Sequence, residues 1–430
     1  MSIRLSEIRF NHDPNSATND AINVRRSNLQ FGSVPEWREG VNVSPADSAA
    51  AYAIEETRGR TITIQARFTT DEPGLHSAQI RAIQPPADEV PYWWLGWMLS
   101  PFLAWPALHN YLLLIYIQRW TFAPPAVDNV LGEVRPKEVV FGSDGASGQE
   151  LFELQGVRMA VQGVGAYPVT WRWQFRRRAE EPWTDIVDTH HRIYVLLRVP
   201  RAPWEQAPFT SNNTQLPWLD VMDYACLWAS GATSVDQAGS QVTRAVFDLG
   251  PEVVSYDCPG GGSNHYTGVD AFTPFNCSGF LARLRGAGGS YYLNCTDCAT
   301  ITSTFANILG CDLSQSAMFS DFGIGVSYPI NAVVPIGSNS FGTACGFNYL
   351  IFHEVAWAGD CLAADEVFDA CFLVDGDSDP TRPPHTPMLP ANIRFGEPGD
   401  GQYRDRLAAP AGRANCQPQP LATRVRRWVV

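Results

Sequence analysis

The sequence predicts a multidomain protein, with an N-terminal all-β sandwich of immunoglobulin-like architecture followed by an α+β domain. Alternating apolar and polar residues, separated by turn residues, fill the first half. Helical periodicity appears only after about residue 217, and all ten cysteines lie at or after Cys226. We therefore expect a β-sandwich domain at residues 1–205, an α+β domain at residues 206–395 and a C-terminal tail at residues 396–430.

The composition of the chain indicates which binding partners and which cellular compartment to expect. The 430 residues carry a net charge of −13, which argues against a nucleic-acid-binding protein. Two short arginine runs, at residues 176–178 and 424–427, are expected to be solvated surface charges. The first residues contain no apolar stretch typical of a cleavable signal peptide, so we expect a cytoplasmic protein or one exported by a non-classical route. Its cysteines should then be mostly reduced, buried thiols.

The first half reads as short strands. Strict alternation is clearest at residues 3–10, 61–68 and 169–175, with turn residues between such segments. This spacing is typical of an antiparallel sandwich, in which one face of each strand packs inward. No residue of this half is expected to be catalytic.

A hydrophobic, aromatic insertion at residues 91–119 interrupts the strands. Tyr92 to Ile117 is uncharged and long enough to span a bilayer, although Pro101 and Pro106 divide it. One interpretation is a hairpin that spans or dips into a membrane. The other is an insertion packed against the protein's own surface or against a partner protein.

Residues 200–217 are rich in proline and polar residues and read as a linker. Two helices should follow it, the second beginning after Ser234 and ending near Gly250. Later, residues 347–357 and 366–376 read as two strands joined by a short loop.

The stretch from Tyr291 to Gly310 places Cys295 at the start of a predicted helix. Ile301, Phe305 and Ile308 recur at helical spacing and predict one buried face, and Gly310 should end the helix. Unpaired N–H groups and the helix dipole would stabilise the Cys295 thiolate, which is the reactive form.

A cysteine nucleophile needs a base and a group that orients the base. His353 lies on a predicted strand and Asp369 on the next, so a hairpin could place them side by side. In this hypothesis Cys295 attacks a carbonyl carbon, His353 transfers the proton and Asp369 orients the imidazole. The backbone N–H of Cys295 would help to stabilise the oxyanion.

These residues resemble the transglutaminase-like family of cysteine acyl-transfer enzymes, which are related to papain-like peptidases. Cys295, Asp297, Ala299 and Gly310 match one family motif, and the offset of sixteen positions from His353 to Asp369 matches the second. The resemblance covers residues 206–390. It departs from the family at two positions: Val355 replaces a common tryptophan two residues after the histidine, and Asn294 replaces a common glycine.

The resemblance implies a transglutaminase/papain-like fold and acyl transfer from an amide bond through a thioester. Hydrolysis would make the protein a peptidase or amidase, and transfer to an amine would make it a transglutaminase; we favour hydrolysis, because no acidic pocket for an amine is evident. The substrate would be a protein or peptide amide, with no cofactor and no metal. If the N-terminal half delivered an active second domain to its target, the protein could be deployed as a bacterial effector.

A non-catalytic alternative is a binding or structural protein that docks on a membrane or protein assembly through the sandwich and the insertion. Local alternatives also stay open. Cys295 and Cys298 form a CxxC that could be a redox pair, or half a zinc site. His265 is a second candidate base. In the zinc alternative, Cys258, Cys277 or Cys311 would supply further ligands. Asp375, Asp377 and Asp379 form an acidic turn that only loosely resembles a calcium-binding loop, and we expect this turn to be solvated.

Overall fold

The computed structural model describes residues 3–13, 19–28, 35–41, 45–86, 129–204, 215–268, 270, 272–342, 344–346 and 348–430. The insertion at residues 91–119 lies outside this set, so both of its interpretations stay predictions. Within these ranges, no helix is both long and apolar enough to cross a membrane. The chain forms two compact units, residues 1–199 with 206–233, and residues 200–205 with 234–430.

These units differ from the predicted domains at both ends of the second domain. Helix α5 (Leu219–Trp228) belongs to the first unit, where Asp223 accepts a hydrogen bond from Tyr194 at 2.5 Å. The predicted tail belongs to the second unit, where β21 (Gln417–Pro418) pairs with β12 (Ser314–Phe319). Arg427, expected to be solvated, is buried, and its guanidinium lies 3.9 Å from the buried carboxylate of Glu354.

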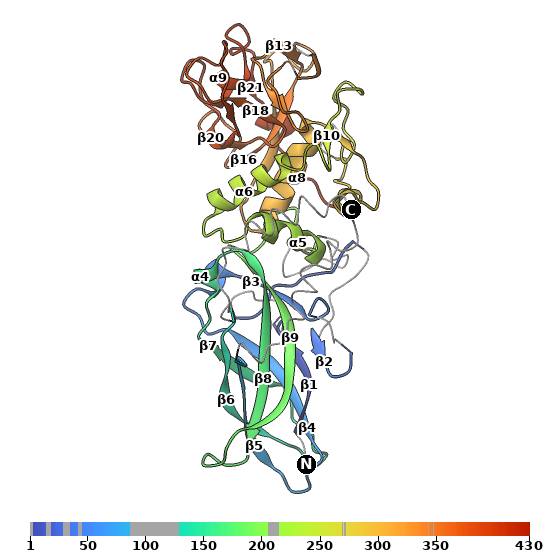
Figure 1. Ribbon diagram of the computed structural model, residues 1–430, viewed down its shortest axis with the longest axis vertical. Helices are drawn as coiled ribbons and strands as arrows, with labels where there is room; N and C mark the ends of the chain where they lie inside the picture. Colours follow the sequence, from blue (N-terminus) through green and yellow to red (C-terminus); the bar gives the residue numbers. More distant parts are fainter. Residues whose placement is uncertain are drawn as a thin grey trace. The chain divides into compact units, whose positions relative to one another are not determined.

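The first unit is built on one long sheet (Figure 1). Among the described residues, its strands run in the order β2-β1-β4-β7-β6-β5-β8-β9-β3, and all neighbours are antiparallel except β3 and β9. Short helices α1 (Ile54–Thr57) and α4 (Met159–Gln162) accompany them. The strands are β1 (Ile3–Arg9), β2 (Trp37–Arg38), β3 (Ala49–Ala53), β4 (Thr63–Thr70), β5 (Ser77–Ile83), β6 (Glu133–Val140), β7 (Glu150–Gln155), β8 (Gly165–Arg176) and β9 (Thr184–Leu196).

This sheet bends over so that its two ends pack against each other. Phe68 on β4 and Phe152 on β7 contact the ring of Trp173 on β8, although β8 is bonded to neither strand. Phe10 packs on Trp171 in the same way. Two layers therefore enclose an aromatic core, as a sandwich would, but the hydrogen bonding is continuous, and the immunoglobulin-like topology is not confirmed.

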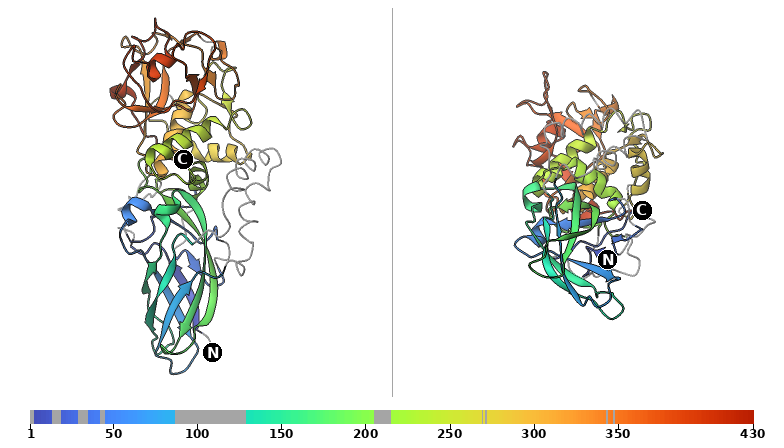
Figure 2. Two further views of the ribbon diagram at one scale, coloured as in Figure 1. Left: turned by 60° about the vertical axis from the view of Figure 1, so that its left-hand side comes forward. Right: turned by 60° about the horizontal axis from the view of Figure 1, so that its bottom comes forward.

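The second unit combines helices with small sheets (Figures 1 and 2). In the part that the structure describes, one sheet has the order β20-β17-β16-β12-β21. The helices are α6 (Val235–Phe247), α7 (Cys277–Leu284), α8 (Cys295–Ile308), α9 (Tyr403–Leu407), α10 (Pro420–Thr423) and the 3-10 turn η1 (Ala344–Gly346). The remaining strands are β10 (Ser255–Tyr256), β11 (Tyr292–Leu293), β13 (Tyr328–Pro329), β14 (Val334–Pro335), β15 (Tyr349–Leu350), β16 (His353–Trp357), β17 (Glu366–Phe368), β18 (Phe372–Asp375), β19 (Pro387–Met388) and β20 (Ala391–Arg394).

Helix α8 forms the centre of this unit. It packs against α6, β12 and β16, and every one of its residues is buried, so the prediction of a single buried face was wrong. Its hydroxyl groups make this burial tolerable, since Thr300 and Ser303 donate to backbone carbonyls one turn earlier. The predicted limits are confirmed: the helix begins at Cys295, and Gly310 follows its end with a φ of 92°.

Candidate active site

Asn294 starts helix α8 and thereby fixes the position of Cys295. The Asn294 side chain accepts the Asp297 N–H at 3.0 Å, and the Asp297 carboxylate accepts the Asn294 N–H at 3.2 Å, which is a capping box. Asparagine is therefore well suited to the position where the family motif has glycine. Cys295 is the first helical residue and is 5% exposed, and its own N–H makes no hydrogen bond within the described residues.

Asp297 also anchors the loop that passes over the helix start. Its carboxylate accepts hydrogen bonds from the backbone N–H groups of His265, Tyr266 and Thr267, at 2.8 to 3.1 Å. Burial raises the pKa of Asp297 to about 6, although these backbone hydrogen bonds oppose the increase. The acidic residue two positions after Cys295 is thus a structural residue that holds this loop.

His353 lies on β16, opposite Met318 of β12, and is fully buried. Its Nε2 is 3.0 Å from Asp369 Oδ2, and its ring stacks on Phe372 with centroids 4.6 Å apart. Nδ1 makes no hydrogen bond with any described residue. After the Asp369 charge and hydrogen bond, the Cys295 side chain is the next cause that raises the pKa of His353, so the thiol lies near the ring. Nδ1 is the ring nitrogen left to receive a proton from the thiol.

Asp369 occupies the break between β17 and β18, rather than a strand as predicted. The break lets its carboxylate collect four hydrogen-bond partners. Oδ1 accepts the N–H groups of Cys371 at 2.7 Å and Phe372 at 3.2 Å, and Oδ2 accepts the hydroxyl of Tyr403 at 2.8 Å and faces His353. These partners fix the orientation of the buried carboxylate toward His353. Tyr403 lies in the predicted tail, where no motif pointed to it.

A pH dependence of stability follows from this arrangement. Burial lowers the pKa of His353, but the Asp369 charge and hydrogen bond, together with Cys295, outweigh it and raise the pKa to about 10. Because the folded pKa exceeds the ordinary value of about 6.5, the stabilisation is complete below that pH and is lost as pH rises toward 10. We expect the free energy of unfolding, measured with urea, to fall between pH 6.5 and 8.5.

The His353→Gln variant isolates this effect from other groups that titrate in the same window. The wild-type free energy of unfolding should fall more steeply with pH than that of the variant. Parallel profiles for the two proteins would contradict the assignment of a raised pKa to His353.

Tyr256 places a phenol hydroxyl beside Cys295. Strand β10 pairs in parallel with β11, with Tyr256 opposite Leu293, two residues before the cysteine. Burial and then the Cys295 charge are the largest causes that raise the pKa of Tyr256. Its hydroxyl makes no hydrogen bond with any residue the structure describes. A Cβ added to Gly262 would lie 2.9 Å from this hydroxyl, and the Gly262 carbonyl accepts the Asn294 side chain at 2.9 Å.

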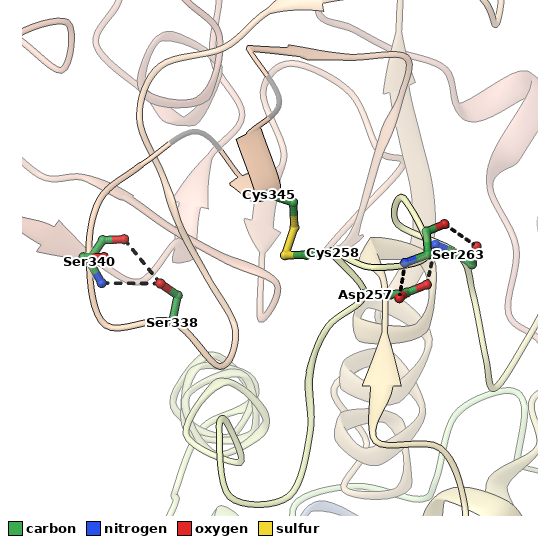
Figure 3. Close-up of a disulfide and its surroundings, with 7 residues drawn as sticks. Asp257, Cys258, Ser263, Ser338, Ser340 and Cys345 are labelled. Atoms are coloured by element: carbon green, nitrogen blue, oxygen red, sulfur yellow. Dashed lines mark hydrogen bonds between the residues drawn. A yellow bond between two sulfur atoms is a disulfide. The ribbon is translucent and has the colours of Figure 1, made fainter.

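His265, the second candidate base, is tied into its loop. Its Nε2 is 3.1 Å from the buried carboxylate of Asp257, and its N–H is held by Asp297. The next residue after Asp257, Cys258, forms a disulfide with Cys345 (Figure 3). Two cysteines are thus oxidised, which departs from the expectation of reduced thiols, and the other eight are buried thiols.

The structure gives no support to the metal alternatives. Cys258 is committed to its disulfide, and among the described residues no group of cysteine, histidine, aspartate or glutamate could hold a metal ion. Cys298 is a free thiol that interacts with Cys371. Asp375, expected in a solvated turn, is buried and lies 2.6 Å from His385 Nδ1.

Comparisons with known proteins give a limited result. No model of a protein family matches the sequence, and no curated protein matches it. Among solved structures, the chain is similar to a transglutaminase of red sea bream, with a TM-score of 0.36 and 10% sequence identity. The similarity covers 78% of this chain and 51% of that one, so the chain spans about half the length of that structure. The function is therefore argued from the geometry above.

Proposed function

We propose that the protein is a cysteine-dependent acyl-transfer enzyme that acts on amide bonds through a thioester. The observation that carries the proposal is the fully buried His353–Asp369 pair at 3.0 Å, with one ring nitrogen unbonded and the Cys295 thiol in electrostatic contact with the ring. A buried imidazole oriented by a carboxylate and placed near a thiol at a helix start is suited to nucleophilic catalysis.

In the proposed mechanism, the thiol proton is already held on the His353 ring, which its raised pKa favours, and the Cys295 thiolate attacks the carbonyl carbon of the amide. The oxygen of the tetrahedral intermediate accepts a hydrogen bond from the backbone N–H of Cys295. His353 then donates its proton to the leaving amine, the carbon–nitrogen bond breaks and a thioester remains. Water, deprotonated by His353, then attacks the thioester carbon, the carbon–sulfur bond breaks, and the acid leaves with the proton retained by the Cys295–His353 pair, which makes the enzyme a peptidase or amidase. An amine in place of water would make it a transglutaminase.

Labelling with an electrophile tests this proposal directly. Iodoacetamide at neutral pH should alkylate Cys295 well before the other free cysteines, because only its thiol has both the helix start and an oriented imidazole. Peptide mapping by mass spectrometry identifies the modified residue. An unlabelled Cys295, or equal labelling of Cys298, would instead favour the non-catalytic alternative.

Tyr256 supplies the second oxyanion donor in this proposal. Its hydroxyl makes no hydrogen bond with any described residue, and Tyr256 lies on β10, which pairs with β11 two residues before Cys295. We expect Tyr256→Phe to lower kcat by roughly 10²-fold, the usual effect of losing one oxyanion donor, with little change in KM. Tyr292→Phe, on the neighbouring strand, is the control and should keep kcat within about twofold. An unchanged kcat for Tyr256→Phe would contradict the role.

A further inference from the structure

A cluster of large apolar side chains is exposed in the second unit, which we call the apolar rim. Its members come from two segments, residues 322–326 and 349–351. They are Phe322 at 85% exposure, Ile324 at 68%, Val326 at 40%, Tyr349 at 57% and Ile351 at 51%. Side chains of this size are normally buried, and several together on a surface usually mark a binding site.

The segment that carries the first three rim residues begins beside the strand of His353 and ends at the buried Tyr328. It leaves β12 just after Met318, which lies opposite His353. It enters β13 at Tyr328, a buried phenol whose pKa is raised by burial and, among other groups, by Cys295 and Asp369. The rim is thus attached at both ends to residues that surround the nucleophile.

The second rim segment, residues 349–351, lies next to β13. Strand β15 pairs with β13, so that Tyr328 lies opposite Leu350 and Pro329 lies opposite Tyr349 (Figure 1). Ile351 follows this strand and precedes His353 by two residues. Both rim segments are therefore continuous with the catalytic strands.

The surrounding chain is almost free of charge. Among the 33 residues from Ser320 to Phe352, Asp321 is the only charged one, whereas 17% of the whole chain is charged. Apart from Asp321, this stretch offers no ion-pair partner to a charged ligand. It favours a ligand that buries apolar surface.

We infer that the apolar rim binds hydrophobic side chains that flank the reacting amide, so that the substrate is a protein or peptide segment with large apolar residues beside that amide. This inference rests on the proposed acyl-transfer function. Substrate binding would cover side chains that are otherwise left in water, and the binding energy would position the amide carbonyl at Cys295.

The test compares two peptide amides of equal length, one with leucine and phenylalanine beside the reacting amide and one with serine and aspartate. The full chain should have a kcat/KM roughly 10- to 100-fold higher for the apolar peptide. The double substitution Phe322→Ser, Ile324→Ser should remove most of this preference. Leu421→Ser, at a fully exposed apolar residue outside the rim, is the control and should keep it.

p-Nitrophenyl acetate serves as a small acyl donor that does not reach the rim. The double variant should react with this ester at the wild-type rate. An equal loss of activity toward the ester and toward the apolar peptide would overturn the inference. Equal turnover of the two peptides by the wild-type chain would also overturn it. No reaction of the wild type with this ester would instead count against the acyl-transfer function itself. Phosphatidylcholine vesicles that bind the wild type but not the double variant, with peptide preference unchanged, would assign the rim to a membrane and overturn the inference.

Discussion

Cys295→Ala should abolish amide turnover, lowering kcat by on the order of 10⁴-fold or more, because no other group can form the thioester. Stability should change by only about 1 kcal/mol, since a small buried side chain is replaced by one slightly smaller and the cap formed by Asn294 and Asp297 is untouched. Steady-state kinetics and urea unfolding measure the two effects separately.

Cys298→Ala is the matched control for this experiment. Cys298 lies one turn later on α8, is 1% exposed and is also a free thiol, so the packing change is similar. It should keep kcat within about tenfold, because its sulfur contacts Cys371 rather than an unbonded ring nitrogen. If the Cys295 variant turned over normally, or if the Cys298 variant were the inactive one, the assignment of the nucleophile would be wrong.

Asp369→Asn should lower kcat by on the order of 10³- to 10⁴-fold while preserving the shape of the side chain. The neutral amide no longer stabilises a protonated His353, and its oxygen and nitrogen can favour the wrong tautomer of the ring. The pKa of His353 should fall for the same reason, because the Asp369 charge is the largest of the causes that raise it. Kinetics across pH would therefore show the limb due to His353 displaced toward lower pH.

Tyr403→Phe tests the same carboxylate while leaving its charge in place. It removes one donor, at 2.8 Å from Oδ2, so the loss in kcat should be only roughly tenfold. If the Tyr403 and Asp369 variants lost activity equally, packing around the carboxylate rather than its charge would be the important property.

Local signals predicted the central part of the candidate site. The helical spacing of Ile301, Phe305 and Ile308 predicted a helix starting near Cys295, and Gly310 predicted its end, whereas the cap formed by Asn294 and Asp297 was not predicted. A strand containing His353, with Asp369 close to it, follows from two apolar segments with a short loop between them, although the structure divides the predicted strand at residues 347–357 into β15 and β16. Each of these signals depends on residues that are near one another in the sequence.

The features that the sequence did not predict depend on distant segments. Helix α8 is buried on every side because strands and helices from other parts of the unit surround it, and periodicity cannot report that. Tyr403 reaches Asp369 from 34 residues away, and Cys258 pairs with Cys345 across 87 residues. In the first unit, alternation identified strands but could not distinguish two separate sheets from one bent sheet.

Because β21 pairs with β12, a fragment that lacks the C-terminal residues should not fold properly. A fragment ending at residue 395 would lose Tyr403, the buried Arg427 and the strand that covers β12. It would leave the edge of β12 open, and open edges recruit other chains. Inclusion bodies from such a fragment would reflect that missing edge strand, and a soluble catalytic unit should extend to Val430, whose N–H donates to the Phe275 carbonyl.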